Sequence, residues 1–404
     1  MIWIVAWRNV WRNPGRSLVV IASIIIGIWA LVFLVAFSNG FLNGYLDNAI
    51  KYEFSNLQIH HPDFKKDYDI KYTIENGDAM VEEIGKMEEI KAVSGRSLSN
   101  GMISSTRKAT GIQIIGIDPG QESAINQLDE LVAEGTYFEK IKRNPVLIGE
   151  KLAEELKVSV RSKVVLTFHD ADGNITAGSF RVEGIIKSTA IKLNQGSAFV
   201  RRSDLNKLLE IPDAMHQISI VSVDSENDNL LKTKLTELYP NFQTETWREL
   251  APGLNFMLQW FKSSLRILIA IIMIALAFGI VNTMLMAVLE RFKELGMLMA
   301  IGMNKSRIFI MIVLETFFLA LVGGPLGMLA GYLHVSYLSS SGMDLSDYSK
   351  GLESMGYQSV IYPNVETFIY WEMTLAVLIT AFVGAMYPAY KAMNMNPIEA
   401  LHKI

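Results

Sequence analysis

Two long stretches of this chain carry no formal charge. Between Arg16 and Asp47 lie 30 uncharged residues, and between Arg266 and Glu290 lie 23. A helix needs about 20 mostly apolar residues to cross the hydrocarbon core of a bilayer. These stretches therefore exclude a purely soluble protein. The charged fraction points the same way, since it is 19% here and about 25% in an average soluble domain.

The hydropathy pattern predicts four membrane-spanning helices. We expect them at residues 16–40, 265–289, 308–333 and 371–390. The third span contains one charged residue, Glu315, near its basic end. A carboxylate inside a membrane is a candidate for a role in transport. At this shallow depth it could equally have a structural role, either reaching the interface or capping a neighbouring helix.

The charges predict how the chain is oriented. Residues 1–16, 290–307 and 391–404 together carry a net charge of +6, whereas the segments on the other side of the predicted membrane sum to −9. Short basic segments stay in the cytoplasm. We therefore expect both termini and the 290–307 segment in the cytoplasm, with a large domain at 41–262 and a loop at 334–370 outside. An acidic outer domain also argues against nucleic acid as a partner.

The first 15 residues have a pattern of their own. Three tryptophans recur every four residues, and two arginines form a second stripe: Trp3, Trp7 and Trp11, then Arg8 and Arg12. Pro14-Gly15 follows and ends the pattern. Tryptophan favours the headgroup layer and arginine favours anionic lipid. This predicts an amphipathic elbow helix on the inner membrane face; alternatively, the tryptophans simply pack against other helices.

The 41–262 domain reads as mixed α and β structure. Alternating apolar residues predict strands at 56–61, 90–103, 111–117, 145–148, 163–169, 178–187, 197–200, 216–223 and 242–246, and helices at 78–87, 149–157, 203–209 and 227–238. Asp170–Asn174 predicts a hairpin turn, because Asp-Gly and Gly-Asn tolerate positive φ. The same stretch resembles a calcium loop only superficially, since the spaced carboxylates of an EF-hand are missing.

No catalytic constellation is present in the sequence. There is no Gly-x-x-x-x-Gly-Lys-Ser/Thr phosphate loop, no His-Glu-x-x-His and no Gly-x-Ser-x-Gly. His60-His61 is a poor metal site, because adjacent residues on a strand point to opposite faces. We therefore expect no metal site and no bound cofactor in this chain, so any energy source must be a partner.

Two segments carry more specific signals. Gly323, Gly327 and Gly331 repeat every four residues on the third span, a pattern typical of close helix–helix packing. Pro325 lies among them and predicts a kink. The segment from Glu290 to Gly302 alternates charged and apolar residues, which predicts a short amphipathic helix that docks a soluble subunit.

Three separated motifs together resemble the MacB/FtsX-type ABC transporter permeases. They are the 290–302 segment, with its acidic-Gly-x-x-x-Ala-x-Gly string; the endings Tyr387-Pro388-Ala389-Tyr390-Lys391-Ala392 and Asn396-Pro397-Ile398-Glu399-Ala400-Leu401; and the start Arg8-Asn9-Val10-Trp11-Arg12-Asn13-Pro14. One large domain followed by three spans also fits this family.

Other motifs are most similar to the lipoprotein-releasing (Lol) branch: Asn39-Gly40-Phe41, Gly116-Ile117-Asp118-Pro119 and Ile148-Gly149-Glu150-Lys151-Leu152-Ala153. The chain departs from that branch in three places. The hairpin at 170–178 is short where the chaperone-recruiting subunit has a long hook, Arg161-Ser162-Lys163 replaces the usual Gly-Asp turn, and the loop through 344–363 is longer.

The resemblance implies an α-helical membrane protein with four transmembrane helices and a large α+β periplasmic domain, in which a ferredoxin-like porter subdomain holds a β-rich insert near 118–200. It implies a multi-pass protein of the bacterial inner membrane. Its expected partners are a cytoplasmic ABC ATPase dimer that binds ATP and Mg²⁺, a second permease copy or paralogue, membrane lipids and a periplasmic lipoprotein chaperone.

The resemblance also implies roles for individual residues. The ATPase-coupling residues would be Glu290, Arg291, Glu294, Leu295, Gly296, Met297, Ala300 and Gly302. The lateral gate for a lipoprotein would contain Asn39, Gly40, Phe41, Trp260 and Phe261. Two other functions stay open: a MacB-like efflux or FtsX-like mechanotransmission permease that drives an envelope partner, and a membrane receptor or scaffold outside the ABC class.

Overall fold

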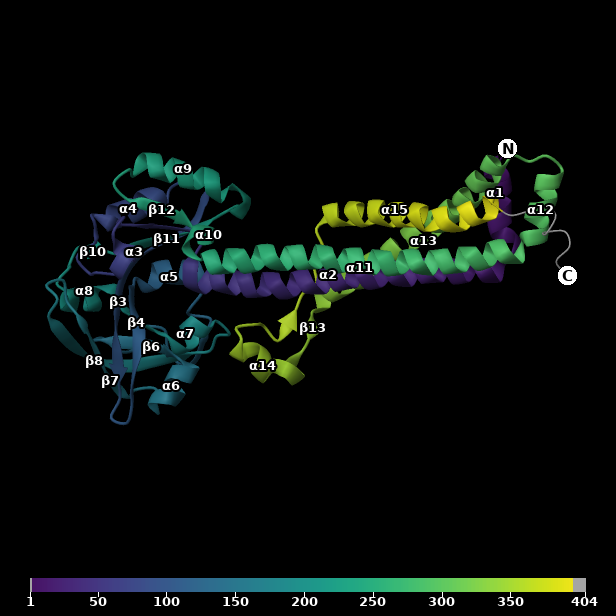
Figure 1. The fold of residues 1–404 in the computed structure, drawn as a ribbon. Coiled ribbons are helices and arrows are strands. Elements are labelled where there is room, and N and C mark those ends of the chain that lie inside the picture. The colour runs from purple at the N-terminus through teal and green to yellow at the C-terminus, as the bar shows by residue number, and fades with distance from the viewer. Residues whose placement is uncertain (1, 395–404) are drawn as a thin grey trace. The chain divides into compact units, whose positions relative to one another are not determined.

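The computed structural model describes residues 2–394 of the chain. It divides into two compact units, one helical and one of mixed α/β structure (Figure 1). The helical unit comprises the N-terminal part up to Leu42, residues 258–345 and the part from Val360 onward. The α/β unit comprises residues 43–257 and 346–359.

Within the described residues, four helices are long and apolar enough to cross a bilayer: α2 (Pro14–Ala49), α11 (Pro252–Glu290), α13 (Lys305–Ser341) and α15 (Thr367–Met393). The prediction of four spans is confirmed, and each predicted range lies inside one helix. The helices exceed the predicted ranges because helical hydrogen bonding continues past the apolar run that marks the hydrocarbon. The loop expected at 334–370 is correspondingly shorter, at 342–366.

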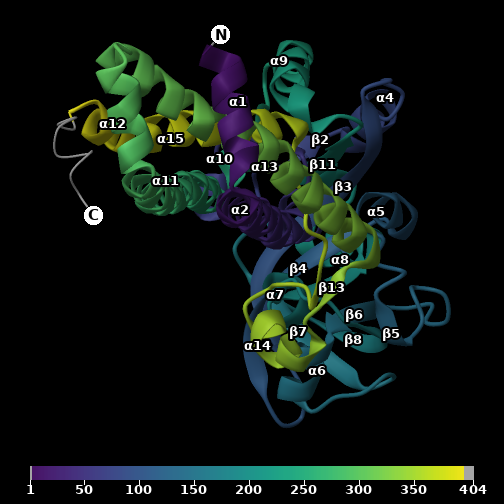
Figure 2. The same cartoon turned by 90° about the vertical axis from the view of Figure 1, so that its right-hand side faces the viewer.

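A short helix, α1 (Ile2–Arg12), precedes α2 and lies beside α13 (Figure 2). Its buried face contains Ala6 and Val10. The ring of Trp7 is 5.3 Å from that of Phe318 on α13, yet 41% of Trp7 remains exposed. The tryptophan stripe therefore contacts another helix along one edge. Helix α2 begins at Pro14, where the missing N–H of proline costs nothing.

The helix α13 packs tightly on α2 through its three glycines. A Cβ atom built on Gly323 would lie 3.0 Å from the Cβ of Ile24, and one on Gly331 would lie 2.9 Å from that of Val32. At Gly327 the contacts are Cβ of Ile28 at 3.0 Å and the backbone of the preceding turn at 3.1 Å. No larger residue fits at these positions without displacing α2. Helix α13 continues through Pro325.

The first lobe of the α/β unit has a ferredoxin-like arrangement. Its elements follow the order β-α-β-β-α-β: β1 (Leu57–His60), α4 (Gly77–Ile84), β3 (Ile90–Ser104), β11 (Gln217–Ser222), α9 (Asp228–Leu238) and β12 (Gln243–Thr246). The strands pair in the antiparallel order β12-β1-β11-β3. Both helices cover one face of this sheet, burying Val81 and Leu235 against Ile59 and Ile218.

A second lobe is inserted between β3 and β11. Its elements are β4 (Ala109–Ile117), α5 (Pro119–Asn126), β5 (Val132–Gly135), β6 (Pro145–Gly149), α6 (Glu150–Leu156), β7 (Lys163–His169), β8 (Ile175–Ile186), α7 (Ile191–Gln195), β9 (Ser197–Arg201) and α8 (Arg202–Leu209). The outer half of β3, from Ser97, pairs with β4 and β7. The insert is therefore larger than the predicted 118–200, because one long strand serves both lobes and hides the boundary from the sequence.

The predicted hairpin turn at Asp170–Asn174 is confirmed, since it joins β7 and β8. Arg161, at the position where the permease family usually has Gly-Asp, adopts a φ of 73°. That region of φ favours glycine. Arg161 thus adopts a backbone conformation at this turn that glycine takes more readily.

His216 is buried where the two lobes of the α/β unit meet. Its Nδ1 accepts a hydrogen bond from the Leu98 N–H at 3.0 Å, and its Nε2 lies 3.0 Å from the carbonyl oxygen of Ile70. Its ring stacks on Phe64 at 5.0 Å. Burial lowers the pKa of His216 to about 4. The partners assign a neutral ring with its proton on Nε2.

Several short elements were not predicted. In the connecting segment 342–366 they are β13 (Met343–Asp344), η3 (Ser346–Tyr348), α14 (Ser349–Ser354) and β14 (Val360–Ile361), and in the α/β unit they are η1 (Ile50–Phe54), α3 (Phe64–Asp67), β2 (Ile74–Glu75), β10 (Ala214–Met215), η2 (Ser225–Asn227) and α10 (Trp247–Leu250), besides α5, β5 and α7. Apart from α5, each spans two to six residues, which gives little hydrophobic periodicity; α5 has eight residues, but they are mostly polar.

Candidate coupling site

The segment between the second and third spans forms a short helix, α12 (Phe292–Ala300). Leu295 and Gly296 are buried against the helical unit, whereas Met297 is 53% exposed and Ile301 is 79% exposed. Gly302 ends the segment with a φ of 98°, which other residues rarely adopt. This arrangement confirms the amphipathic helix predicted from the alternating pattern.

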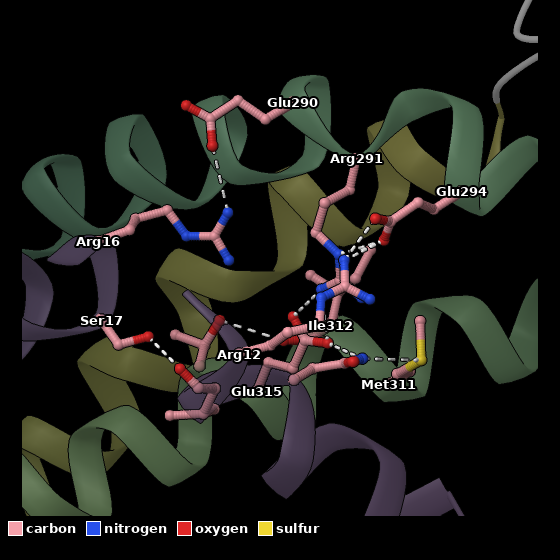
Figure 3. Close-up of polar contacts among 12 residues, drawn as sticks. Arg12, Arg16, Ser17, Glu290, Arg291, Glu294, Met311, Ile312 and Glu315 are labelled. Carbon is pink, nitrogen blue, oxygen red and sulfur yellow. Dashed lines mark hydrogen bonds and ion pairs between the residues drawn. The ribbon is translucent and has the colours of Figure 1, made fainter. Parts of the chain in front are cut away.

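The inner side of α12 is held by a chain of polar side chains that the backbone of α1 closes into a ring (Figure 3). The Arg291 Nη1 atom donates to both carboxylate oxygens of Glu315, at 2.9 and 3.0 Å. Asn9 Nδ2 donates to Glu315 Oε1 at 2.7 Å. Arg291 Nε donates to Glu294 at 3.2 Å, and Arg12 pairs with the same carboxylate. The ring thus joins α1, α12, α13 and the residue that precedes α12.

The central pair of this ring is shielded from solvent. Glu315 is 4% exposed and Arg291 is 8% exposed. A buried carboxylate is tolerated when an opposite charge and hydrogen bonds compensate it, and both are present here. This geometry supports the structural alternative for Glu315. The hydrogen bond from Arg12 holds the pKa of Glu294 below its ordinary value, with Arg291 adding to the effect.

A second pair lies next to the ring but outside it. Arg16 Nη1, on α2, is 3.3 Å from the Glu290 carboxylate at the end of α11. Glu290 and Glu294 had been expected among the ATPase-coupling residues. In the structure both carboxylates pair with arginines of this chain, so each is at least partly neutralised internally.

The outward face of α12 and the turn after it are apolar and basic. Met297, Ala300 and Ile301 are exposed, and exposed cations flank them: Lys293, Lys305 and Arg307. Among the ion pairs of residues 2–394, none involves these three cations. Asn304 starts α13 by accepting a hydrogen bond from the Ser306 N–H at 3.2 Å. The face available to a partner is therefore hydrophobic with a positive rim.

The residues expected at the gate lie on two helices of the helical unit. Asn39, Gly40 and Phe41 are on α2, and Phe41 stacks on Phe37 with ring centroids 6.2 Å apart. A Cβ on Gly40 would lie only 2.3 Å from the Tyr362 carbonyl oxygen, so this glycine permits close backbone packing. On α11, Trp260 is 64% exposed and Phe261 is partly buried.

Sequence reasoning missed Asn9 and Arg12 as members of the site. They were assigned to the membrane surface, because nothing in the pattern connects residue 9 with residue 315. One usable signal was Glu315 itself, since a carboxylate within a span requires a compensating partner, but nothing in the sequence distinguishes Arg291 from the other nearby cations.

Two family descriptions match the chain. The MacB-like periplasmic core domain matches residues 17–238, which is more than half of the chain. The FtsX-like permease C-terminal description matches residues 266–397.

The chain is also similar to individual proteins. An uncharacterised ABC transporter permease of Methanocaldococcus jannaschii is 26% identical over 281 residues, covering 67% of this chain and 65% of the relative. The lipoprotein-releasing system transmembrane protein LolC of Haemophilus influenzae is 22% identical over 298 residues, covering 72% and 71%. The periplasmic region of MacB from Actinobacillus actinomycetemcomitans has a TM-score of 0.37 at 13% identity, covering 52% of this chain and 97% of that one.

Four helices long and apolar enough to cross a bilayer, an α/β domain after the first of them and an amphipathic helix between the second and third define a multi-span membrane protein with a large extramembrane domain. The chain belongs to the MacB/FtsX family of ABC transporter permeases. This removes the alternative of a receptor or scaffold outside the ABC class.

Proposed function

We propose that this chain is the non-catalytic permease subunit of an ABC transporter whose separate ATPase subunits dock on α12. The observation that carries the proposal is the outward face of α12, where Met297, Ala300 and Ile301 are exposed while the opposite face is held by the ring. ATP and Mg²⁺ would be bound by the partner. Two permease chains, identical or paralogous, would combine with an ATPase dimer.

We further propose a location in the bacterial inner membrane with α12 and both termini in the cytoplasm and the α/β unit in the periplasm. The support is the charge difference between the two sides, +6 against −9. An apolar helix face with a positive rim suits a soluble protein with an apolar groove and acidic edges.

A substitution on the exposed face of α12 tests the docking proposal. Ile301→Asp should abolish copurification of the ATPase from mild detergent, because it places a charge in the apolar contact. The matched control is Val223→Asp, which makes the same kind of change at a 66% exposed residue of the α/β unit. Equal ATPase recovery with both variants would contradict docking at α12.

The finer proposal is that ATP hydrolysis extracts lipoproteins from the membrane for sorting to the outer membrane. Its support is the similarity to LolC and the aromatic residues on α2 near Gly40. Acyl chains would enter between the first span of one permease and the second span of its partner. The β7–β8 hairpin is short, so this proposal assigns it no contact with a periplasmic lipoprotein chaperone.

A crosslinking experiment tests the lipoprotein proposal. A photoreactive residue at Ser38 should crosslink to a triacylated lipoprotein, and Phe41→Ala should reduce the yield, because a fully buried aromatic ring contributes about 1.5–3 kcal/mol of apolar contact. Copurification of the ATPase should persist in that variant. Absence of lipoprotein crosslinking in the parent protein would favour the second function, MacB-like efflux or FtsX-like mechanotransmission, which the match to the MacB-like domain favours.

A further inference from the structure

The polar ring is closed by α1, a helix that lies far from α12 in the sequence. Starting from Glu315 on α13, it passes through Arg291 and Glu294 to α1, and returns to Glu315 through Asn9. The two α1 residues, Asn9 and Arg12, are three positions apart and so lie on neighbouring parts of one helix face. Helix α1 thus contacts both α12 and α13 through hydrogen bonds (Figure 3).

This closure restricts how α12 can move. If α12 tilted away from α13, Arg291 would have to leave Glu315 and both charges would lose their compensation in a buried site. If α12 slid along α1, Glu294 would have to leave Arg12. A force applied to the exposed face of α12 therefore acts on α13 and α1 at the same time.

The route beyond the ring is also tightly packed. Eight residues separate Glu315 from Gly323, which corresponds to about 12 Å along the axis of α13. At Gly323, Gly327 and Gly331 the helix lies against α2 with no room for a larger side chain. Close-packed interfaces transmit displacement instead of absorbing it.

We propose that α1, α12 and α13 form one rigid element, fastened by the Asn9–Glu315–Arg291–Glu294–Arg12 ring, which transfers a displacement of the docking helix to α2. Arg291 and Glu315 are positioning residues in this element. The proposal rests on the proposed function in one respect: the displacement would come from an ATPase docked on α12. The rigidity itself is a property of this chain alone.

The chain contains no cysteine, so two spin labels can be placed without background. We would label Lys293→Cys on α12 and Leu321→Cys on α13; residue 321 is 48% exposed and lies about 24 Å along the helix from Lys305. Pulsed EPR would measure the distance distribution in the full permease, alone and in complex with its ATPase trapped by ADP and vanadate. The parent should give one narrow distribution in all states.

Three variants distinguish the effect of breaking the ring from a general loss of stability. Glu315→Gln and Arg12→Gln each break the ring, and Arg12 is half-exposed, so its replacement preserves the fold. Arg16→Gln is the matched control, because it breaks the neighbouring pair outside the ring. Both ring variants should broaden the distribution and, with the ATPase still bound, lower its activation by the permease at least about fivefold. Arg16→Gln should match the parent.

The outcomes separate this proposal from the docking proposal. A broad distribution in the parent permease alone, or ring variants that behave like Arg16→Gln, would overturn the rigid element whether or not an ATPase binds. The parent permease could instead recover no ATPase, keep a narrow distance distribution and show a broader one after Arg12→Gln. That result would contradict the docking proposal and support the rigid element.

Discussion

Replacing Gly327 by alanine tests how tightly α13 is held against α2. The added Cβ would lie 3.0 Å from the Ile28 Cβ and 3.1 Å from both the Cα and the carbonyl oxygen of Ile25. Two of these three atoms belong to the backbone, so no side-chain rotation relieves the overlap. The same substitution at Gly279 on α11 is the control, because nothing lies within 4 Å of its Cβ position.

The magnitude follows from two opposing effects. Alanine is favoured over glycine inside a helix by about 1 kcal/mol, and this gain applies at both positions. Overpacking a filled interface costs about 1–3 kcal/mol, and this cost applies only at Gly327. The free energies of unfolding of the two variants should therefore differ by about 1–3 kcal/mol, with Gly327→Ala the less stable.

The assay is reversible unfolding in mixed micelles of a mild detergent and sodium dodecyl sulfate, followed by tryptophan fluorescence. The two variants and the parent are compared at one mole fraction of the denaturing detergent. Equal shifts for Gly327→Ala and Gly279→Ala would show that α2 and α13 are not in close contact there. The glycine-dependent route from α12 to α2 would then have no physical basis.

Three further predictions address other parts of the chain. Ser225→Cys should react with an impermeant thiol reagent once the outer membrane is permeabilised, whereas Ser306→Cys should react only after the inner membrane is opened; the reverse pattern would overturn the orientation. Because the folded pKa of His216 is about 4, below the unfolded value of about 6.5, the free energy of unfolding should be constant above pH ~7.5 and fall by about 2 kcal/mol between pH 7.5 and 5. Urea unfolding of the detergent-solubilised chain measures this loss, and His216→Gln should remove it. Gly40→Ala should lower the thermal unfolding midpoint while Gly44→Ala, whose nearest neighbour is 3.9 Å away, should not; equal midpoints would contradict the close approach.

The sequence was most informative where one physical requirement acts over many residues. Crossing a bilayer requires a long apolar run, so all four spans could be predicted from hydropathy. Half-buried strands require alternation, so Lys163–His169 was predicted with its observed bounds. The insert boundary could not be predicted, because β3 continues from one lobe into the other and carries no turn signal at Ser97.

The candidate site could be predicted only in its local features. The exposed face of α12 follows from local alternation and was predicted. The ring depends on a contact between Asn9 and Glu315, which lie 306 positions apart in sequence. No periodicity records such a contact, since it arises only when α1 packs beside α13. The charges of Glu290 and Glu294 were assigned outward for the same reason: their arginine partners lie on distant helices.

The inserted lobe has a consequence for how the chain folds as it is made. Strand β1 is hydrogen-bonded on one side to β11 and on the other to β12, and its Leu57 and Ile59 are fully buried only when both are in place. Roughly 155 residues, about 100 of them in the insert, are synthesised between β1 and the first of these partners, which takes roughly 8–30 s at cellular translation rates. The strands of the insert pair mainly with one another and can assemble during that interval. Both edges of β1 stay open until β11 emerges, and one edge stays open until β12 emerges, so a chain stalled before Thr246 presents an edge prone to aggregation.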